Sequence, residues 1–121
     1  MARPLVTVRV DGRVVCERCL VATTPLARMR GLLGRSDLPR GEGILLRPAG
    51  SIHTFFMRFP IDVVFLDREN RVVDVERELV PWRTAKRRGA KAVLELAAGT
   101  TAEIGLQSGA QLSLAGSGPN G

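Results

Sequence analysis

The sequence predicts a mainly β protein: one compact sandwich-like or barrel-like domain of about eight short strands, with one early helix and one short helical turn. Three observations support this prediction. Apolar and polar residues alternate in short runs, as in Val6, Val8 and Val10. Turn residues interrupt those runs at close spacing. The apolar runs are far shorter than a membrane-spanning helix, yet 45% hydrophobic residues in 121 suffice for one core.

The chain begins with a predicted hairpin. The alternating run 6–10 and the apolar run 13–15 flank Asp11-Gly12, a pair that is a strong short-range signal for a two-residue hairpin turn. Residues 20–22 continue the extended character. We therefore expect two antiparallel strands at the amino-terminal end.

The early helix is expected over residues 24–34. Thr24 is a favourable N-cap, and Pro25 suits the first helical position because the N–H group that it lacks has no partner there. Gly34 is placed to end the helix. The side chains that form its apolar stripe are Leu26, Met29 and Leu33.

The rest of the chain returns to strand composition. The apolar run 61–67 predicts a central strand buried on both faces, because it lacks the alternation of a half-exposed strand. Thr100 and Glu103 have the spacing of a capping box and predict one helical turn. Further strands are expected at 44–46, 51–56, 73–75, 93–96 and 112–114.

These elements place a single β-rich domain at 1–114 and a flexible tail at 115–121, where Gly, Ser and Pro replace apolar anchors. The first residues lack the apolar core of an export signal, so a cytoplasmic location is expected. The net charge of +6 favours acidic partners, although 16 of the 18 cations are Arg, a bias that coding preference alone can produce. No motif for a cofactor is present.

Several stretches together resemble one known family. They are Arg30-Gly31-Leu32-Leu33-Gly34-Arg35, Gly41-Glu42-Gly43-Ile44-Leu45, His53-Thr54-Phe55-Phe56-Met57, Phe59-Pro60-Ile61-Asp62 and Val93-Leu94-Glu95-Leu96. In order and spacing the chain resembles the bacterial and archaeal family known as domain of unknown function 192, over roughly residues 19–114. The resemblance implies a mainly β fold with one early helix, and it implies no activity. The chain departs from the commoner pattern at Arg58-Phe59 and Gly109-Ala110.

Polar residues within these stretches form the first candidate site. Arg35, His53, Met57 and Asp62 stand among apolar residues, and a strand at 51–56 places His53 and Met57 on one face. The main hypothesis is a non-catalytic binding module that holds a small polar or anionic ligand, or a protein partner, on this surface. The alternative is a hydrogen-bonded His beside core side chains.

A hydrolase is a further alternative. His53 is a possible base because an imidazole titrates near neutral pH, and Ser51 and Thr54 are possible nucleophiles by proximity. Asp62 and Asp67 are a possible acid and base, but residues five positions apart on a strand face opposite sides. No nucleophile elbow is present. The sequence therefore favours a protein that is not an enzyme, without deciding the question.

Cys16 and Cys19 form a CxxC motif. Neither a βαβ unit nor a second Cys pair accompanies them, so a redox or structural zinc site lacks its usual context. The candidate metal ligands are limited to Cys16, Cys19 and His53.

The segment 83–91 carries five cations and no acidic residue, and Trp82 precedes it. An aromatic ring beside cations can stack on a base or nucleotide, so this loop is a candidate for binding nucleic acid or phosphate. Its residues are Trp82, Arg83, Lys86, Arg87, Arg88 and Lys91.

Overall fold

The structure is a computed structural model that describes residues 5–24, 32 and 34–116. The described elements are β1 (Leu5–Val10), β2 (Arg13–Ala22), β3 (Glu42–Leu46), β4 (Ser51–His53), β5 (Ile61–Leu66), β6 (Val72–Leu79), β7 (Thr84–Lys86), β8 (Ala92–Ala97), α2 (Thr100–Ile104) and β9 (Leu112–Gly116). Within these ranges no helix is long and apolar enough to cross a membrane. The predicted helix at 24–34 falls mostly outside the described residues.

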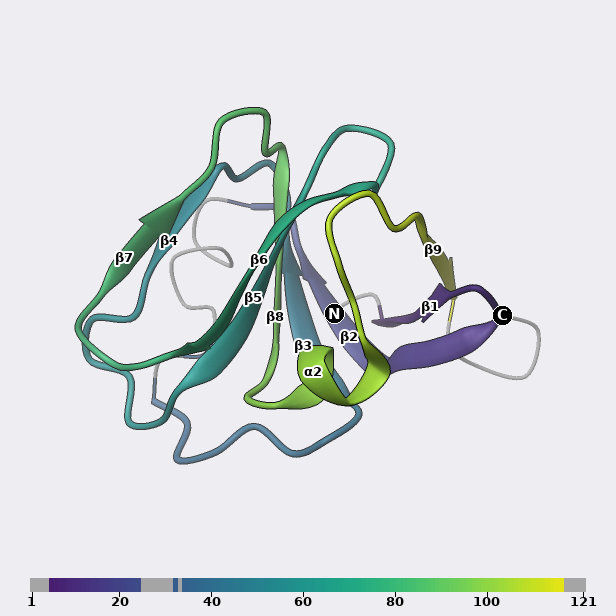
Figure 1. Cartoon of the computed structure of the whole chain (residues 1–121). Helices are drawn as coiled ribbons and strands as arrows, with labels where there is room; N and C mark the ends of the chain where they lie inside the picture. Colours follow the sequence, from purple (N-terminus) through teal and green to yellow (C-terminus); the bar gives the residue numbers. More distant parts are fainter. Residues whose placement is uncertain (1–4, 25–31, 33, 117–121) are drawn as a thin grey trace.

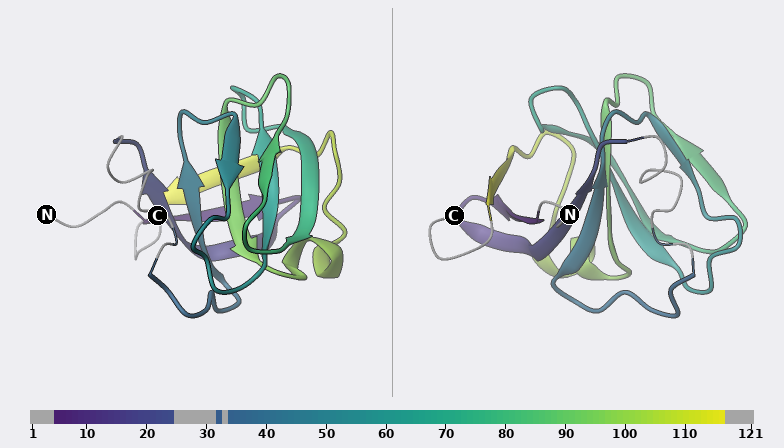
Figure 2. Two further views of the ribbon diagram at one scale, coloured as in Figure 1. Left: turned by 90° about the vertical axis from the view of Figure 1, so that its left-hand side faces the viewer. Right: turned by 180° about the vertical axis from the view of Figure 1, so that it is seen from behind.

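A seven-stranded sheet in the order β6-β5-β8-β3-β2-β1-β9 forms the body of the molecule. It curls into a half-barrel (Figures 1 and 2). A bridge between Arg71 and Gln111 joins the two edge strands at one point. The helix α2 contacts β2, β6 and β8. The predicted mainly β fold class is confirmed.

The sheet buries apolar side chains on both faces. One face, with α2, encloses the α2-side core, which includes Val64, Leu66 and Leu94. The other face is covered by the β4–β7 ribbon, a separate two-stranded sheet (Figure 1). Between them lies the ribbon-side core, which includes Val63 and Phe65. All six residues of β5 are buried, as expected for a central strand.

The Asp11-Gly12 hairpin is present. Both turn residues have positive φ, 50° and 77°, which is what a two-residue turn between twisted strands requires. The short helix also lies where it was expected, but the predicted capping box is wrong. Gly99 is the N-cap, so Thr100 lies inside the helix and no side chain caps it from that position.

Two predictions near the ribbon are also wrong. The strand expected at 51–56 ends at His53, because residues 54–57 turn back, with Met57 N–H donating to Thr54 O at 3.2 Å. The segment 83–91 is not wholly a loop, since β7 occupies three of its residues and pairs with β4. His53 and Met57 therefore do not share one strand face.

Candidate functional site: an exposed aromatic and basic surface

The four residues of the first candidate site lie in different surroundings. His53 is exposed on β4, whereas Met57 is buried in the ribbon-side core. Arg35 is exposed and forms an ion pair with Glu42 at 3.1 Å. Of these residues, only His53 belongs to the aromatic surface described below.

Asp62 lies on the opposite face of the sheet. Its side chain is buried, and its carboxylate accepts hydrogen bonds from Thr101 N–H at 2.9 Å, Thr101 Oγ1 at 2.7 Å and Glu78 N–H at 2.9 Å. One of these donors is an N–H group of the first turn of α2, which has no partner within the helix. Asp62 therefore joins α2 and β6 to β5, and it is separated from His53 by the sheet.

Four rings cluster at one end of the β4–β7 ribbon and form what we call the aromatic surface. His53 stacks on Phe55 with 4.9 Å between centroids, and Phe55 stacks on Trp82 at 5.8 Å. Phe56 is tilted against Trp82 at 4.7 Å. Phe56 is 70% exposed and Trp82 is 55% exposed, so this end of the ribbon presents a contiguous set of rings to solvent.

The buried hydroxyl of Thr54 connects the two turns that carry the rings. Thr54 Oγ1 donates to Val80 O at 2.7 Å and accepts from Arg83 N–H at 2.9 Å. The backbone of Thr54 adds two bonds, from its own N–H to Arg83 O and from Trp82 N–H to its carbonyl oxygen. One side chain thus fixes the turn at 80–83 against the turn at 54–57.

Both exposed rings are attached to strained backbone. Phe56 and Trp82 each have φ of 67°, in the left-handed region that Gly and Asn tolerate and bulky residues avoid. Folding alone favours Gly or Asn at such positions. Strain of this kind at exposed bulky residues points to a functional role.

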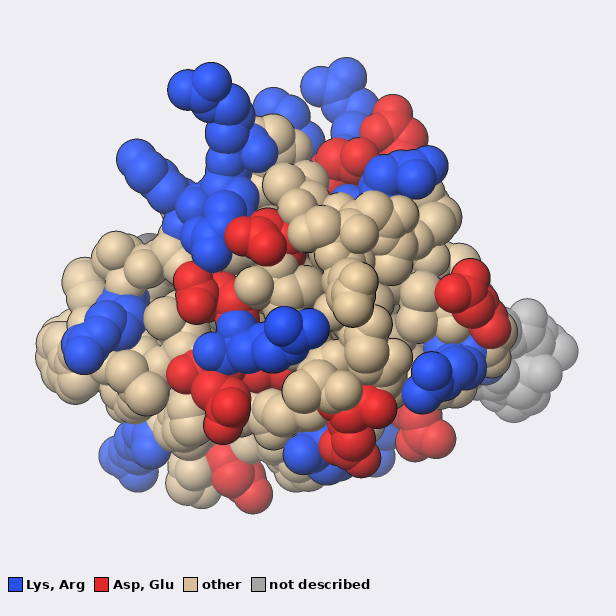
Figure 3. All heavy atoms as spheres, viewed as in Figure 1, with Lys and Arg blue, Asp and Glu red and all other residues tan. Residues whose placement is uncertain are grey.

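The two segments that carry the rings run the length of the β4–β7 ribbon and have only positive charge. Residues 51–60 and 80–91 contain no Asp or Glu. Their cations are Arg58, Arg83, Lys86, Arg87, Arg88 and Lys91. In Figure 3 the left edge of the molecule is uncharged surface crossed by Lys or Arg side chains, and the acidic side chains lie further in.

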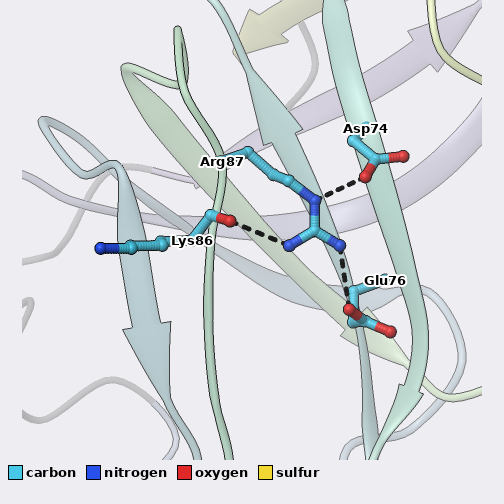
Figure 4. Close-up of polar contacts among 4 residues, drawn as sticks. All are labelled: Asp74, Glu76, Lys86 and Arg87. Carbon is cyan, nitrogen blue, oxygen red and sulfur yellow. Dashed lines mark hydrogen bonds and ion pairs between the residues drawn. The ribbon is translucent and has the colours of Figure 1, made fainter.

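Arg87 differs from the other cations of these segments. Its guanidinium donates to Asp74 at 2.5 Å and to Glu76 at 2.9 Å, both on β6 (Figure 4). It also lies over the ring of Phe65, 5.0 Å from the centroid. The hydrogen bond from Arg87 lowers the pKa of Asp74. Arg87 thus anchors the basic segment, while the remaining five cations are exposed and have no carboxylate partner within the described part of the chain.

The two cysteines lie in the α2-side core. The three residue steps from Cys16 to Cys19 in β2 lie opposite only two residue steps of β1, so a β-bulge turns both side chains inward. A hydrogen bond between the thiols lowers the pKa of Cys16 and raises that of Cys19. Neither cysteine is exposed, and the sheet separates them from His53. Among the described residues no group of three or more metal-ligating side chains occurs.

The residues considered for hydrolysis are used in the fold. Besides the Thr54 hydroxyl, the carboxylate of Asp67 accepts backbone N–H bonds from Glu69 and Arg71 within its own turn. Ser51 lies at the far end of β4 from the rings and pairs with Lys86. These contacts are structural.

Glu95 is a buried carboxyl that the motifs did not single out. It is 4% exposed in β8, and its neighbours across the sheet are Ile44 and Val63. No hydrogen bond or ion pair reaches its carboxyl from the described residues. Burial raises the pKa of Glu95 to about 7. The only sequence signal is an acidic residue within an otherwise apolar strand.

A family model described as Uncharacterized ACR, COG1430 (DUF192) matches residues 6–114. The chain belongs to the DUF192 family. A UPF0127 protein of Thermococcus sibiricus is 37% identical over 106 residues, which span 80% of this chain and 68% of that protein. A UPF0127 protein of Pyrococcus horikoshii is 41% identical over 68 residues, which span 52% of this chain and 56% of that protein.

Solved structures share the DUF192 fold. A Novosphingobium aromaticivorans protein of unknown function matches with a TM-score of 0.79 and 25% identity, over 90% of this chain and 83% of that one. A Sinorhizobium meliloti protein matches with a TM-score of 0.81 and 23% identity, over 93% of this chain and 94% of that one. The likeness to the second structure shows the fold alone.

Replacing Thr54 by Val in the DUF192 chain tests the role of its hydroxyl. The two side chains have the same shape, so the change leaves Val80 C=O and Arg83 N–H without their partner, at a cost of about 2 kcal/mol. Urea unfolding measures the loss. Thr84→Val, the same change at an exposed position of β7, is the control. Equal stability of the two variants would contradict the assigned role.

Replacing Glu95 by Gln tests the raised pKa. The folded DUF192 chain holds the Glu95 proton up to about pH 7, whereas an unfolded Glu releases it near about pH 4.3. Across that window the unfolded state binds fewer protons, so the free energy of unfolding falls by about 3 kcal/mol as the pH rises. Glu95→Gln lacks this fall. Urea unfolding at about pH 5 and about pH 8 compares the two proteins; parallel profiles would show that the carboxyl has its ordinary pKa.

Proposed function

We propose that this protein is a non-catalytic binding module whose binding surface is the aromatic surface with its surrounding cations. The observation that carries the proposal is the pair Phe56 and Trp82, two bulky side chains that are both exposed and attached to strained backbone. Left-handed backbone costs a non-glycine residue about 1–2 kcal/mol. A partner that covers the rings explains why they occupy these positions.

The partner offers an extended surface that is anionic and partly apolar. Phe56 and Trp82 present 70% and 55% of their surface to solvent from two neighbouring turns, so they suit contact with a broad surface. The exposed cations Arg58 and Arg83 follow Phe56 by two residues and Trp82 by one, and they favour negative charge in the partner. The proposal keeps His53 from the first predicted site and replaces Arg35, Met57 and Asp62 by the neighbouring rings.

Nucleic acid fits this surface less well. A base stacks on a free ring face. Phe55 lies between His53 and Trp82, so both of its faces are occupied and only Phe56 and Trp82 offer ring surface to a base. Single-stranded oligonucleotide would also bind with steep salt dependence through the basic residues.

Replacing Phe56 by Asn separates binding from stability. Asn tolerates left-handed backbone, so relief of about 1–2 kcal/mol offsets the lost ring contact of about 0.5–1.5 kcal/mol. We expect the free energy of unfolding to stay the same or to rise, as urea unfolding measures. A clear loss of stability would show that Phe56 is a structural residue.

The same variant is expected to lose binding of an anionic aromatic dye. Trp82 is the only tryptophan of the chain, so energy transfer from it to anilinonaphthalene sulfonate reports binding at this surface. Phe56→Asn should weaken binding at least about fivefold, which corresponds to roughly 1 kcal/mol. Val14→Asn removes an exposed apolar side chain of β2 and is the control. Equal weakening by both variants would contradict the proposed surface.

A further inference from the structure

Resting on the proposed function, we infer that the partner is the surface of an anionic lipid bilayer. The tips at residues 54–57 and 80–83 enter the interfacial layer with the rings of Phe56 and Trp82 first. The surrounding cations meet the lipid headgroups. The inference follows from the sign of the charge, from the way the rings are exposed and from the layered chemistry of a bilayer.

The charge of the two segments is positive. Over the 22 residues of the segments 51–60 and 80–91 there are six cations and no carboxylate. The Arg87 guanidinium forms ion pairs with Asp74 and Glu76 of β6, which leaves Glu78, exposed two residues before Val80, as the acidic residue next to these segments in the chain. Interfaces between proteins usually interleave charges of both signs at their polar rim. A surface with such an excess of positive charge instead matches an anionic layer.

The rings form an apolar tip. Phe55 stacks between His53 and Trp82, while Phe56 and Trp82 remain 70% and 55% exposed. Val80, 45% exposed, extends this tip beside Trp82. Trp is enriched at the level of the headgroups, where its apolar body and its N–H group are both satisfied. An apolar tip flanked in the chain by the exposed cations Arg58 and Arg83 matches a layer of phosphates that lies directly over hydrocarbon.

The strained backbone supports the same assignment. Gly or Asn at position 56 or 82 would adopt this backbone without strain, and no aromatic ring would then be exposed there. The Thr54 hydroxyl holds both turns in register, so the two rings stand side by side before any partner arrives. A preformed tip avoids the cost of ordering on binding.

The test is co-sedimentation of the full chain with vesicles of phosphatidylcholine alone and with vesicles in which phosphatidylglycerol replaces one third of that lipid. We expect binding to the anionic vesicles with a blue shift of Trp82 emission, and quenching of Trp82 by lipids brominated in the upper acyl chain. Each cation near the surface changes partitioning about fivefold. Arg83→Gln/Lys86→Gln should therefore weaken binding about 25-fold. Phe56→Asn should remove most of the blue shift.

A matched control removes the same charge elsewhere. Arg13→Gln/Arg18→Gln takes two exposed cations from β2 and should leave binding within about twofold. Equal loss of binding in both double variants would show that only net charge matters and would overturn the inference.

The remaining outcomes separate the two proposals. Absence of vesicle binding, with dye binding still dependent on Phe56, would overturn the assignment of a bilayer and leave the proposed function standing with a protein partner. Quenching of Trp82 by a single-stranded oligonucleotide, without vesicle binding, would replace the bilayer by nucleic acid. Loss of the dependence on Phe56 in both assays would overturn both proposals.

Discussion

One hydroxyl group organises the end of the β4–β7 ribbon that carries the aromatic surface. Thr54 belongs to the turn at 54–57, and Val80 begins the second turn 26 residues later in the chain. The Thr54 Oγ1 completes that second turn, at 80–83, by bonding to both Val80 and Arg83. Removing such a buried group leaves two backbone groups unsatisfied. The position of Trp82, and through it the positions of Phe55 and Phe56, depends on this contact.

The opposite face of the sheet carries a second polar anchor. There a buried carboxylate, Asp62, accepts three hydrogen bonds and joins α2 to the sheet. Its bonds are satisfied within the fold. One of its donors is the N–H group of Glu78, an exposed residue whose φ of 52° is also left-handed, so strain is not confined to the turns that carry the rings. What distinguishes the ribbon is that its strained residues, Phe56 and Trp82, carry exposed aromatic rings.

Local signals predicted much of the fold. The Asp11-Gly12 turn and the apolar run of β5 were identified because both depend on a few adjacent residues. The candidate site depended on contacts that a pattern does not encode. Asp62 and His53 stand on opposite sides of the sheet because β5 alternates its side chains between two cores. The Phe56 turn was missed because a bulky residue occupies a position where turn rules expect Gly or Asn.

The cysteine pair shows the same limit. Residues three apart on a regular strand face opposite sides, and only the bulge in β2 directs Cys16 and Cys19 into one core. Glu95 was passed over for a related reason, since its significance lies in its burial. Sequence spacing describes regular elements well. The inward direction of both cysteines comes from an irregular strand, and the significance of Glu95 comes from its burial, and tertiary structure decides both.

The central claim is that the rings are held in place before any partner binds, and the fluorescence anisotropy decay of Trp82 tests it most directly. As the only tryptophan, Trp82 reports its own motion without ambiguity. A ring fixed by the Thr54 contacts should lose anisotropy only as fast as the whole protein tumbles, on a nanosecond timescale. A dominant faster decay, from a ring that moves freely on its turn, would contradict the account.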